Sequence, residues 1–338
     1  MSAELRPQEP PGNWPKDRFG RNEVAVQIWL ISSWLLLIAF VAGVLWLPNF
    51  FENINSKQVV VYAAQDQVYA EPILKDFEKQ TGIKVRAVYD SEATKTVAIA
   101  NRLLAERKHP QCDVYWGNEE LRTRQLASRN IFRETNAWAA FGYRSRRVAV
   151  PVTQSNPVAP ASLLELTNPV YRGKVTLAYP LFGTTATHFL ALRQHWGESN
   201  WLAWCRALAA NKPFLVDGNS VAAKFVARGE ASIGLTDSDD IAAENREGAR
   251  LKSLPMSGET LLIPNTVAVI RNAPHPEAAQ QLFDYLQTSA VTERLVRTGA
   301  LEGAWAADVW STTLKPDWEA VIRDIDSATA TLQNVFLR

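Results

Sequence analysis

Cysteine and histidine, the residues that most often mark metal sites and nucleophilic catalysis, are scarce in this sequence. The two cysteines, Cys112 and Cys205, fit no metal-binding spacing. Their apolar surroundings favour free buried thiols, and a disulfide between them is the alternative in an exported domain. The four histidines are scattered, and no nucleophile elbow accompanies them. We therefore expect a binding protein and not an enzyme, with no cofactor other than a bound metal ion.

The sequence also lacks an excess of charge of either sign. The formal net charge is +1, so the composition gives no support to binding of a nucleic acid. Internal repeats are absent as well. What is there is an ordinary globular composition, with 47% hydrophobic residues in 338 positions. This length predicts two domains.

An uncharged apolar run near the N-terminus predicts a membrane anchor. Residues 1–23 are polar and rich in proline, which predicts a disordered tail. Residues 24–47 form a run of about 24 positions, long enough to span a bilayer. A cleavable signal peptide, the alternative, would have a shorter apolar core and a small-residue cleavage site. Basic residues before the run place the tail in the cytoplasm. We expect a single-pass protein of the inner or plasma membrane, with its binding domain periplasmic or extracellular.

Strand-like and helix-like segments alternate in the exported part. Short apolar runs predict strands at residues 58–63, 83–89, 113–116, 173–178 and 231–235. Amphipathic helical patterns lie between them. This alternation predicts an α/β fold with a parallel sheet and right-handed crossovers.

Two extended segments with internal prolines predict crossings between two lobes. They are residues 146–153, with Pro151, and residues 261–270, with Pro264. Proline favours an edge strand or a connector over a central strand. We therefore predict a first lobe of residues 57–150 and 265–338, and a second lobe of residues 151–264.

The stretch 234–240, GLTDSDD, brings three carboxylates to the end of a predicted buried strand. In open α/β folds, ligands bind beyond the carboxyl ends of the strands. Asp237, Asp239 and Asp240 are therefore candidate ligand-binding residues. The alternative is an acidic helix N-terminus, because Asp caps helices and stabilises their first turn. The triplet alone fits both interpretations equally well.

Four segments carry motifs in a fixed order along the chain. They are FEKQTGIKV at residues 77–85, YRGKVTLAYP at residues 171–180, Pro264-Asn265, and Pro276–Ala279. This set resembles the motifs of bacterial extracellular solute-binding proteins, and most of all their ferric-ion-type branch. The ordered likeness covers residues 57–338. It implies a two-lobed type II periplasmic-binding fold that closes over a ligand by a hinge. It also implies delivery to an ABC permease and its ATPase.

The resemblance implies a cleft in which loops from both lobes meet. The predicted ligand-binding residues are Asp66, Ser91, Glu92, Thr94, Asn118, Gly183, Thr184, Thr185, Asn219, Ser220, Asp237, Asp239 and Asp240. Residues 183–185 precede a predicted helix, whose free N–H groups attract anions. The family uses this place for an anion. Plain capping of the helix by Thr185 is the alternative.

The resemblance also bears on metal binding. Ferric-type members place a tyrosine pair at the positions of Asp239 and Asp240, and a histidine near Asp66. Both features are absent from this sequence. Carboxylate oxygens nevertheless suit hard cations such as Fe³⁺, Ca²⁺ and Mg²⁺. We therefore predict Asp66, Asp239 and Asp240 as candidate metal ligands, with a cationic organic solute as the alternative ligand.

Two functions follow from these expectations. The favoured one is a membrane-tethered substrate-binding component of an ABC importer. Its ligand would be iron, another hard cation or a cationic organic solute, with or without a companion anion. The alternative is a ligand-sensing or scaffold protein on the same fold, because an uncleaved anchor is unusual for a freely diffusing receptor.

Overall fold

The computed structural model describes residues 28, 31–41, 58–90, 95–134, 138–153, 159–256, 258–305 and 313–337. The chain divides into two compact units, Met1–Asn55 and Ser56–Arg338. In the first unit, residues 31–41 are helical, while the predicted tail and the rest of the apolar run lie outside the described residues. Among the described residues, every helix is too short or too polar to cross a membrane.

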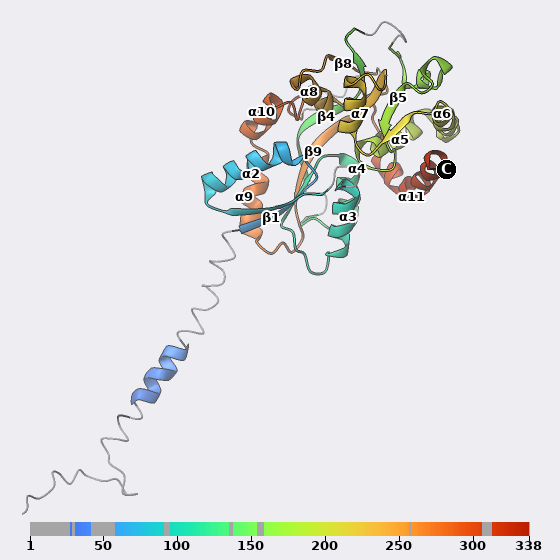
Figure 1. The fold of residues 1–338 in the computed structure, drawn as a ribbon. Helices are drawn as coiled ribbons and strands as arrows, with labels where there is room; N and C mark the ends of the chain where they lie inside the picture. Colours follow the sequence, from blue (N-terminus) through green and yellow to red (C-terminus); the bar gives the residue numbers. More distant parts are fainter. Residues whose placement is uncertain are drawn as a thin grey trace, which may run out of the picture. The chain divides into compact units, whose positions relative to one another are not determined.

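The second unit is an α/β fold whose described strands form one mixed sheet (Figure 1). The strands are β1 Gln58–Ala63, β2 Lys84–Val88, β3 Val114–Gly117, β4 Trp138–Pro151, β5 Val175–Ala178, β6 Phe214–Val216, β7 Ile233–Asp237, β8 Leu251–Leu254 and β9 Leu262–Val269. The helices are α2 Gln67–Thr81, α3 Lys95–Ala105, α4 Glu120–Ser128, α5 Gly183–Trp196, α6 Glu198–Ala210, α7 Asn219–Ala227, α8 Ser238–Arg246, α9 Pro276–Leu286, α10 Ser289–Arg297 and α11 Trp318–Phe336. The prediction of an α/β fold is therefore confirmed.

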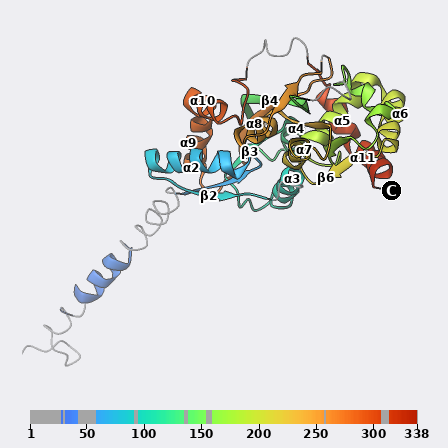
Figure 2. The same ribbon diagram turned by 45° about the horizontal axis from the view of Figure 1, so that its top comes forward.

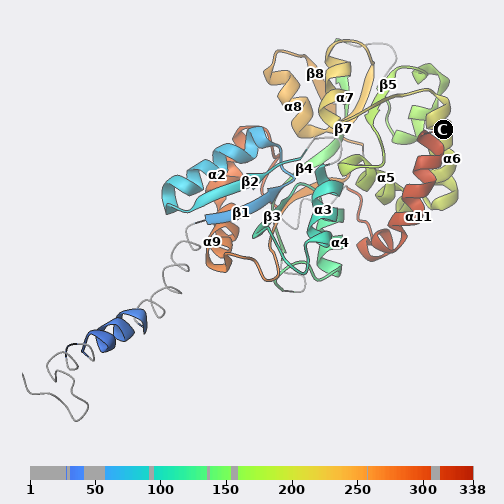
Figure 3. The ribbon, with the colours of Figure 1, turned by 60° about the horizontal axis from the view of Figure 1, so that its bottom comes forward.

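The sheet has two parallel halves joined by two long antiparallel strands. Its order is β2-β1-β3-β9-β4-β7-β5-β6, with β8 paired to β4 beside this path. Strands β2, β1 and β3 run parallel to one another, as do β7, β5 and β6. Strands β9 and β4 lie between these halves and pair antiparallel with each other. Figure 3 shows β4 running between the two halves. The helix that follows each parallel strand therefore begins at the carboxyl edge of its half.

Strand β4 contradicts the prediction that Pro151 excludes a central strand. It pairs with β9 over its first half and with β7 and β8 over its second half. Pro151 is the last residue of β4 and pairs only with Leu251 of β8, so its missing N–H interrupts no central ladder. Pro264 lies beyond the last β3–β9 pair, Gly117 with Thr266. At Pro264, β9 therefore has β4 as its neighbour on one side only.

Separate hydrophobic clusters stabilise the two halves. In the first half, one cluster packs β1, β3 and β9 against α2 and α9, with Phe77 and Leu282 fully buried. A second cluster fills the opposite face under α3 and α4. In the other half, Leu177, Phe189 and Trp204 belong to a cluster formed by β5, α5 and α6. Cys112 and Cys205 are both free and buried, as predicted.

The last helix packs against the second half of the sheet. Val321, Ile325 and Leu332 of α11 belong to the same cluster as α5 and α6. The three helices lie side by side in both views (Figures 1 and 2). Helix α11 also contacts α4, whose Leu121 joins this cluster. The C-terminal segment thus covers the half that contains β5, β6 and β7.

Candidate functional site

A polar cleft lies where the helices of both halves begin. It encloses about 510 Å³ of empty space, part of which opens to solvent. Its walls come from the starts of α2, α3, α4, α5, α7 and α8 and from β4. The lining residues are Asp66, Thr96, Asn118, Arg144, Ala178, Tyr179, Phe182, Gly183, Thr184, Asp217, Gly218, Asn219, Asp237, Asp239 and Asp240. Parallel strands produce this arrangement because each delivers its following helix N-terminus to the same edge.

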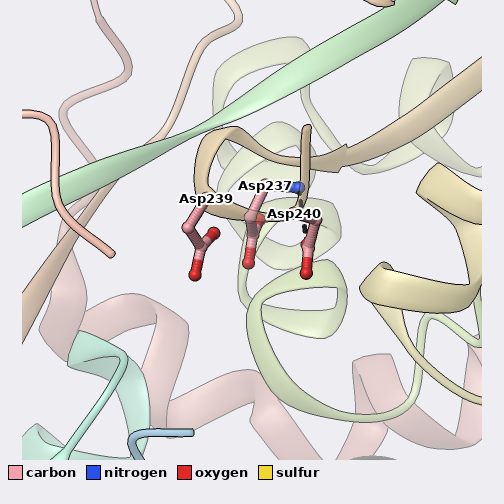
Figure 4. Close-up of side chains that lie close together, drawn as sticks. All are labelled: Asp237, Asp239 and Asp240. Carbon is pink, nitrogen blue, oxygen red and sulfur yellow. Dashed lines mark hydrogen bonds between the residues drawn. The ribbon is translucent and has the colours of Figure 1, made fainter. Parts of the chain in front are cut away.

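The three predicted aspartates stand where β7 ends and α8 begins: Asp237 is the last residue of β7, and Asp239 and Asp240 lie in the first turn of α8. Figure 4 shows their side chains leaving the turn side by side, with the carboxylates pointing the same way. One oxygen of each lies within 4.8 Å of the others. The same three residues nevertheless have different partners, and these partners decide what each carboxylate is free to do.

Asp237 is fully engaged with the protein. Its Oδ1 accepts from Nη1 of Arg146 at 2.6 Å, and its Oδ2 accepts from the hydroxyl of Thr184 at 2.7 Å. Arg144 and Asn219 lie at 3.4 Å from the same Oδ2. Although burial raises it, the two guanidinium groups hold the pKa of Asp237 below its ordinary value. Asp237 is therefore a buried, charged anchor of the second half.

Asp240 caps its own helix. Its Oδ2 accepts from the Asp237 backbone N–H at 3.3 Å and from the Thr236 hydroxyl at 2.9 Å. Asp237 is the N-cap residue of α8, and a reciprocal capping box links the two positions. The capping interpretation of the triplet thus holds for Asp237 and Asp240, while all three residues also line the cleft.

Asp239 is the carboxylate with an open oxygen. It is 5% exposed, and its Oδ1 has no hydrogen-bond partner among the described residues. Nε of Arg144 lies 3.3 Å away, an ion pair without hydrogen-bond geometry. Burial, together with the charges of Asp237 and Asp66, raises the pKa of Asp239 to about 7. This carboxylate therefore needs a further donor or cation to be fully compensated.

Two buried arginines of β4, which the sequence motifs did not indicate, complete the site. Arg146 is fully buried and bridges Asp237, Asn219 and the Leu235 carbonyl. Arg144 lines the cleft at 3% exposure, and its Nη1 has no partner within the described part of the chain. Both share one face of β4 with the apolar residues Val148 and Val150. Basic residues at the inward positions of a strand were the signal that could have identified them.

The start of α5 is a second open element. The side-chain amide of Asn219 donates to the Thr184 hydroxyl, which in turn donates to Asp237. The Thr185 hydroxyl donates to Asn219 at 2.9 Å. In the described structure, no side chain caps the α5 N-terminus, whose first turn is free of acidic residues. Such a helix start attracts an anion through its N–H groups and its dipole.

The structure brings most of the predicted site residues together. Asp66, Asn118, Gly183, Thr184, Asn219 and the three aspartates line the cleft. Thr185 lies behind it, bonded to Asn219, and Ser220 is in the first turn of α7 without lining the cleft. Ser91, Glu92 and Thr94 lie outside the described residues. Sequence reasoning missed Thr96, Tyr179, Phe182 and Asp217, which lack a distinguishing motif.

These features define an α/β binding protein with a polar cleft at the carboxyl edges of two half-sheets. Residues 58–301 match the family of the bacterial extracellular solute-binding proteins, and the chain belongs to this family. A curated relative, an uncharacterized protein of Haemophilus influenzae, is 24% identical over 260 residues, which cover 68% of this chain and 73% of the relative.

Solved structures share the fold. Iron-bound HitA of Pseudomonas aeruginosa has a TM-score of 0.71 at 19% identity, covering 82% of this chain and 99% of that one. The periplasmic binding protein AfuA of Actinobacillus pleuropneumoniae, bound to exogenous fructose-6-phosphate, has a TM-score of 0.72 at 20% identity, covering 83% and 99%. At these identities the likeness shows the periplasmic-binding fold, and the ligand has to be argued from this chain's own residues.

Proposed function

We propose that this protein is the substrate-binding component of an ABC importer and delivers a small solute to a permease and its ATPase. Its family is one of solute-binding proteins. Its cleft receives polar groups from both halves of the sheet. Proteins of the same fold include an iron-bound and a sugar-phosphate-bound member. Binding without chemical conversion is the role that these observations favour.

Two lobes that close about β4 and β9 form part of this proposal. These two strands pass between the two hydrophobic halves, so a change in their twist would open the cleft. The boundaries expected from the sequence assign residues 265–338 to the first lobe. Because α11 packs in the cluster of α5 and α6, we propose that residues 314–337 move with the second lobe instead.

We propose that the solute carries an acidic group at one end. The observation that supports this most directly is Nη1 of Arg144, a buried charged donor without a partner among the described residues, in the wall of the cleft. The uncapped start of α5 lines the same cleft through Gly183 and Thr184. Guanidinium groups and helix N-termini both bind carboxylate and phosphate oxygens strongly.

The other end of the solute carries hydrogen-bond donors. Oδ1 of Asp239 is a buried acceptor that lacks a hydrogen bond within the described residues. Asp66 lies close enough for its charge to raise the pKa of Asp239. A hydroxyl or ammonium group placed beside Asp239 would supply the hydrogen bond that this oxygen lacks. The cleft thus fits a small solute with an acidic end and a donor end.

A melting-temperature screen of the purified full-length chain tests this proposal. Unfolding is monitored by the intrinsic fluorescence of the 12 tryptophans. Inorganic phosphate, organic acids, phosphorylated alcohols, amines, and the chlorides of Ca²⁺, Mg²⁺ and Fe³⁺ form the panel. A ligand that binds only the folded state adds about 2.7 kcal/mol at a hundred times its Kd. We expect the acid-containing solutes to raise the melting temperature. A response to amines or metal ions alone would contradict the proposal.

Matched arginine variants on one strand locate the acidic subsite. Arg144→Lys keeps the buried charge but removes the second terminal nitrogen, and should weaken binding of the acidic hit at least tenfold. Arg147→Lys is the control, because Arg147 lies on the same strand and pairs with Glu302. Equal affinities in the two variants would place the acidic group elsewhere.

A hard cation with a companion anion is the second candidate ligand. The observation in its favour is the approach of oxygens from Asp237, Asp239 and Asp240 to within 4.8 Å of one another. It ranks second because Asp237 already binds two arginines and Asp240 caps α8. Asp239→Asn separates the candidates. It should abolish a melting-temperature rise caused by a metal ion and only reduce one caused by an acidic organic solute.

Membrane tethering through residues 24–47 is a further part of the proposal. Its support is the uncharged apolar sequence preceded by basic residues. In cell fractions we expect the full-length chain to stay with membranes after washing with high salt and alkaline carbonate. Release as a shorter soluble chain would show cleavage instead. Loss of solute uptake on deletion of the gene would distinguish an importer component from a sensor or scaffold.

A further inference from the structure

Three side-chain amides stand in a row beside the cleft. Gln65 follows β1, Asn118 follows β3, and Asn265 lies in β9, and these strands are neighbours in the sheet. The register pairs Ala63 with Trp116 and Gly117 with Thr266. Continued by one or two residues, it sets the three amides opposite one another. Neighbouring strands lie about 4.8 Å apart, so the row is short enough to be spanned by one small molecule. Asn118 is the member of the row that lines the cleft, and Gln65 and Asn265 are buried beside it.

The row faces one side of the sheet. Side chains alternate between the two faces of a strand. Gln65 is two residues beyond Ala63, and Asn118 two beyond Trp116, and both reference residues belong to the cluster under α2 and α9. Asn265 stands in the same relation to Val267 of that cluster. The three amides therefore share the face on which α2 begins.

The polar atoms of this row are buried and unsatisfied. Both amide atoms of Gln65 and of Asn265, and Oδ1 of Asn118, have no hydrogen-bond partner among the described residues. Their exposures are 1%, 0% and 5%. Adjacent amides could bond to one another, and these do not. Buried polar groups in native proteins are nearly always satisfied, so this row points to a missing partner.

The row is continuous with the proposed acidic subsite. Arg144 pairs with Ile263 in the β4–β9 register, two residues along the strand from Asn265. Alternation therefore places the guanidinium on the same face as the amides. Asn118 and Arg144 both line the cleft. A solute whose acidic group meets Arg144 would thus extend its remaining atoms along Asn118 and its two neighbours.

We propose that Gln65, Asn118 and Asn265 bind the hydroxyl groups of the solute, which makes the solute a polyhydroxylated acid of the sugar-phosphate or sugar-acid class. This inference rests on the proposed function, because it identifies the donor end of the acidic solute. An amide offers a donor and an acceptor side by side, and a hydroxyl group also donates and accepts. An ammonium group only donates, so it would leave the amide N–H groups of the row unpaired. A metal ion would leave them unpaired as well.

Calorimetric titration of the full-length chain with matched phosphates tests the inference. The probes are glucose 6-phosphate, glycerol 3-phosphate, O-phosphoethanolamine and inorganic phosphate. We expect the two hydroxylated phosphates to bind at least tenfold more tightly than the other two, since each unpaired buried group costs affinity. Equal or tighter binding of O-phosphoethanolamine would overturn the hydroxyl assignment.

Amide variants show whether the row makes the difference. Asn118→Leu and Gln65→Met keep the approximate volume and remove the amide, and each should weaken glucose 6-phosphate roughly tenfold while leaving inorganic phosphate unchanged. Gln287→Met is the control, because this glutamine is exposed and its side chain donates to the carbonyl of Phe283, away from the cleft lining. If one of the two variants fails to fold, the other still tests whether the amide row binds the hydroxyl groups.

The outcomes separate this inference from the function on which it rests. Unchanged selectivity in both variants would mean that the row holds only water, and would overturn the inference. Preference for inorganic phosphate over every hydroxylated probe would overturn it too, while leaving an acidic ligand in place. Binding of none of the acidic probes, together with a metal-ion response in the melting screen, would overturn both.

Discussion

At the scale of single residues, the three clustered aspartates do different work. Asp237 pairs with two buried guanidinium groups, Asp240 caps a helix, and Asp239 keeps an oxygen without a hydrogen bond among the described residues. The sequence predicted that all three stand at the end of a buried strand, and in the structure they lie where β7 ends and α8 begins. It could not rank them, because the arginines that contact Asp237 and Asp239 come from β4, about 90 residues earlier in the chain.

Asp237→Asn should destabilise the protein more than any other single change at the cleft. It would leave Arg144 and Arg146 buried without adequate countercharge, which costs about 3–5 kcal/mol. Urea unfolding measures this free energy directly. Asp217→Asn is the control, since this exposed carboxylate lines the cleft and should change stability by less than about 0.5 kcal/mol. Similar midpoints for the two variants would refute the anchor role.

Asp239 should make stability depend on pH near neutrality. Its folded pKa of about 7 exceeds that of an ordinary Asp, about 4. Between these values the folded state binds more protons at this position, so stability falls as pH rises from about 4 to 7. Asp239→Asn should remove that fall. We expect the variant to melt several °C above the parent at pH 8 and close to it at pH 4.5. If the melting temperatures of the parent and the variant changed with pH in the same way, Asp239 would not be the group responsible.

At the scale of elements, local pattern predicted the parallel strands and their helices well. Continuous apolar runs bounded by turn residues identified β1, β3 and β5, and the strand start at β7. The failure was β4, where Pro151 suggested a connector. Proline forbids a hydrogen bond only on its own N–H side, and that cost disappears at a strand end. The position of a strand within the sheet depends on its pairing with residues that are distant in the sequence. A local sequence pattern therefore cannot predict it.

Close packing of α7 on β7 is the element-level feature that brings Asn219 to Asp237. A Cβ on Gly234 would lie 2.8 Å from Val226 Cγ2 and 3.4 Å from the Ala222 carbonyl. Gly234→Ala should therefore push α7 away and cost about 1–3 kcal/mol, while weakening the acidic ligand. Gly229→Ala is an unsuitable control because its φ is +75°. Ala227→Gly, at the end of the same helix, serves better. Unchanged affinity in Gly234→Ala would show that this spacing does not support the site.

At the scale of the whole Ser56–Arg338 unit, a contact between Tyr69 and Arg246 links the two halves near the cleft. The Tyr69 hydroxyl on α2 accepts from Nη2 of Arg246 on α8 at 2.7 Å, and the guanidinium lies 5.7 Å from the ring centre. Tyr69 packs with the cluster of the first half, whereas α8 follows β7 in the second. Opening about β4 and β9 would have to break this contact. The contact therefore stabilises the closed arrangement. The free energy that it contributes can be measured by removing the hydrogen bond with a single substitution.

Tyr69→Phe keeps the ring and removes the hydrogen bond, which is worth about 1 kcal/mol. The closed population of the ligand-free protein should fall, and the apparent affinity for the acidic solute should drop about fivefold. Small-angle X-ray scattering should show a larger radius of gyration without ligand and the parent value at saturation. Tyr285→Phe is the control, because Tyr285 packs against Phe77 within the first half. Equal radii for Tyr69→Phe and the parent in the ligand-free state would mean that Tyr69 and Arg246 do not hold the two halves together.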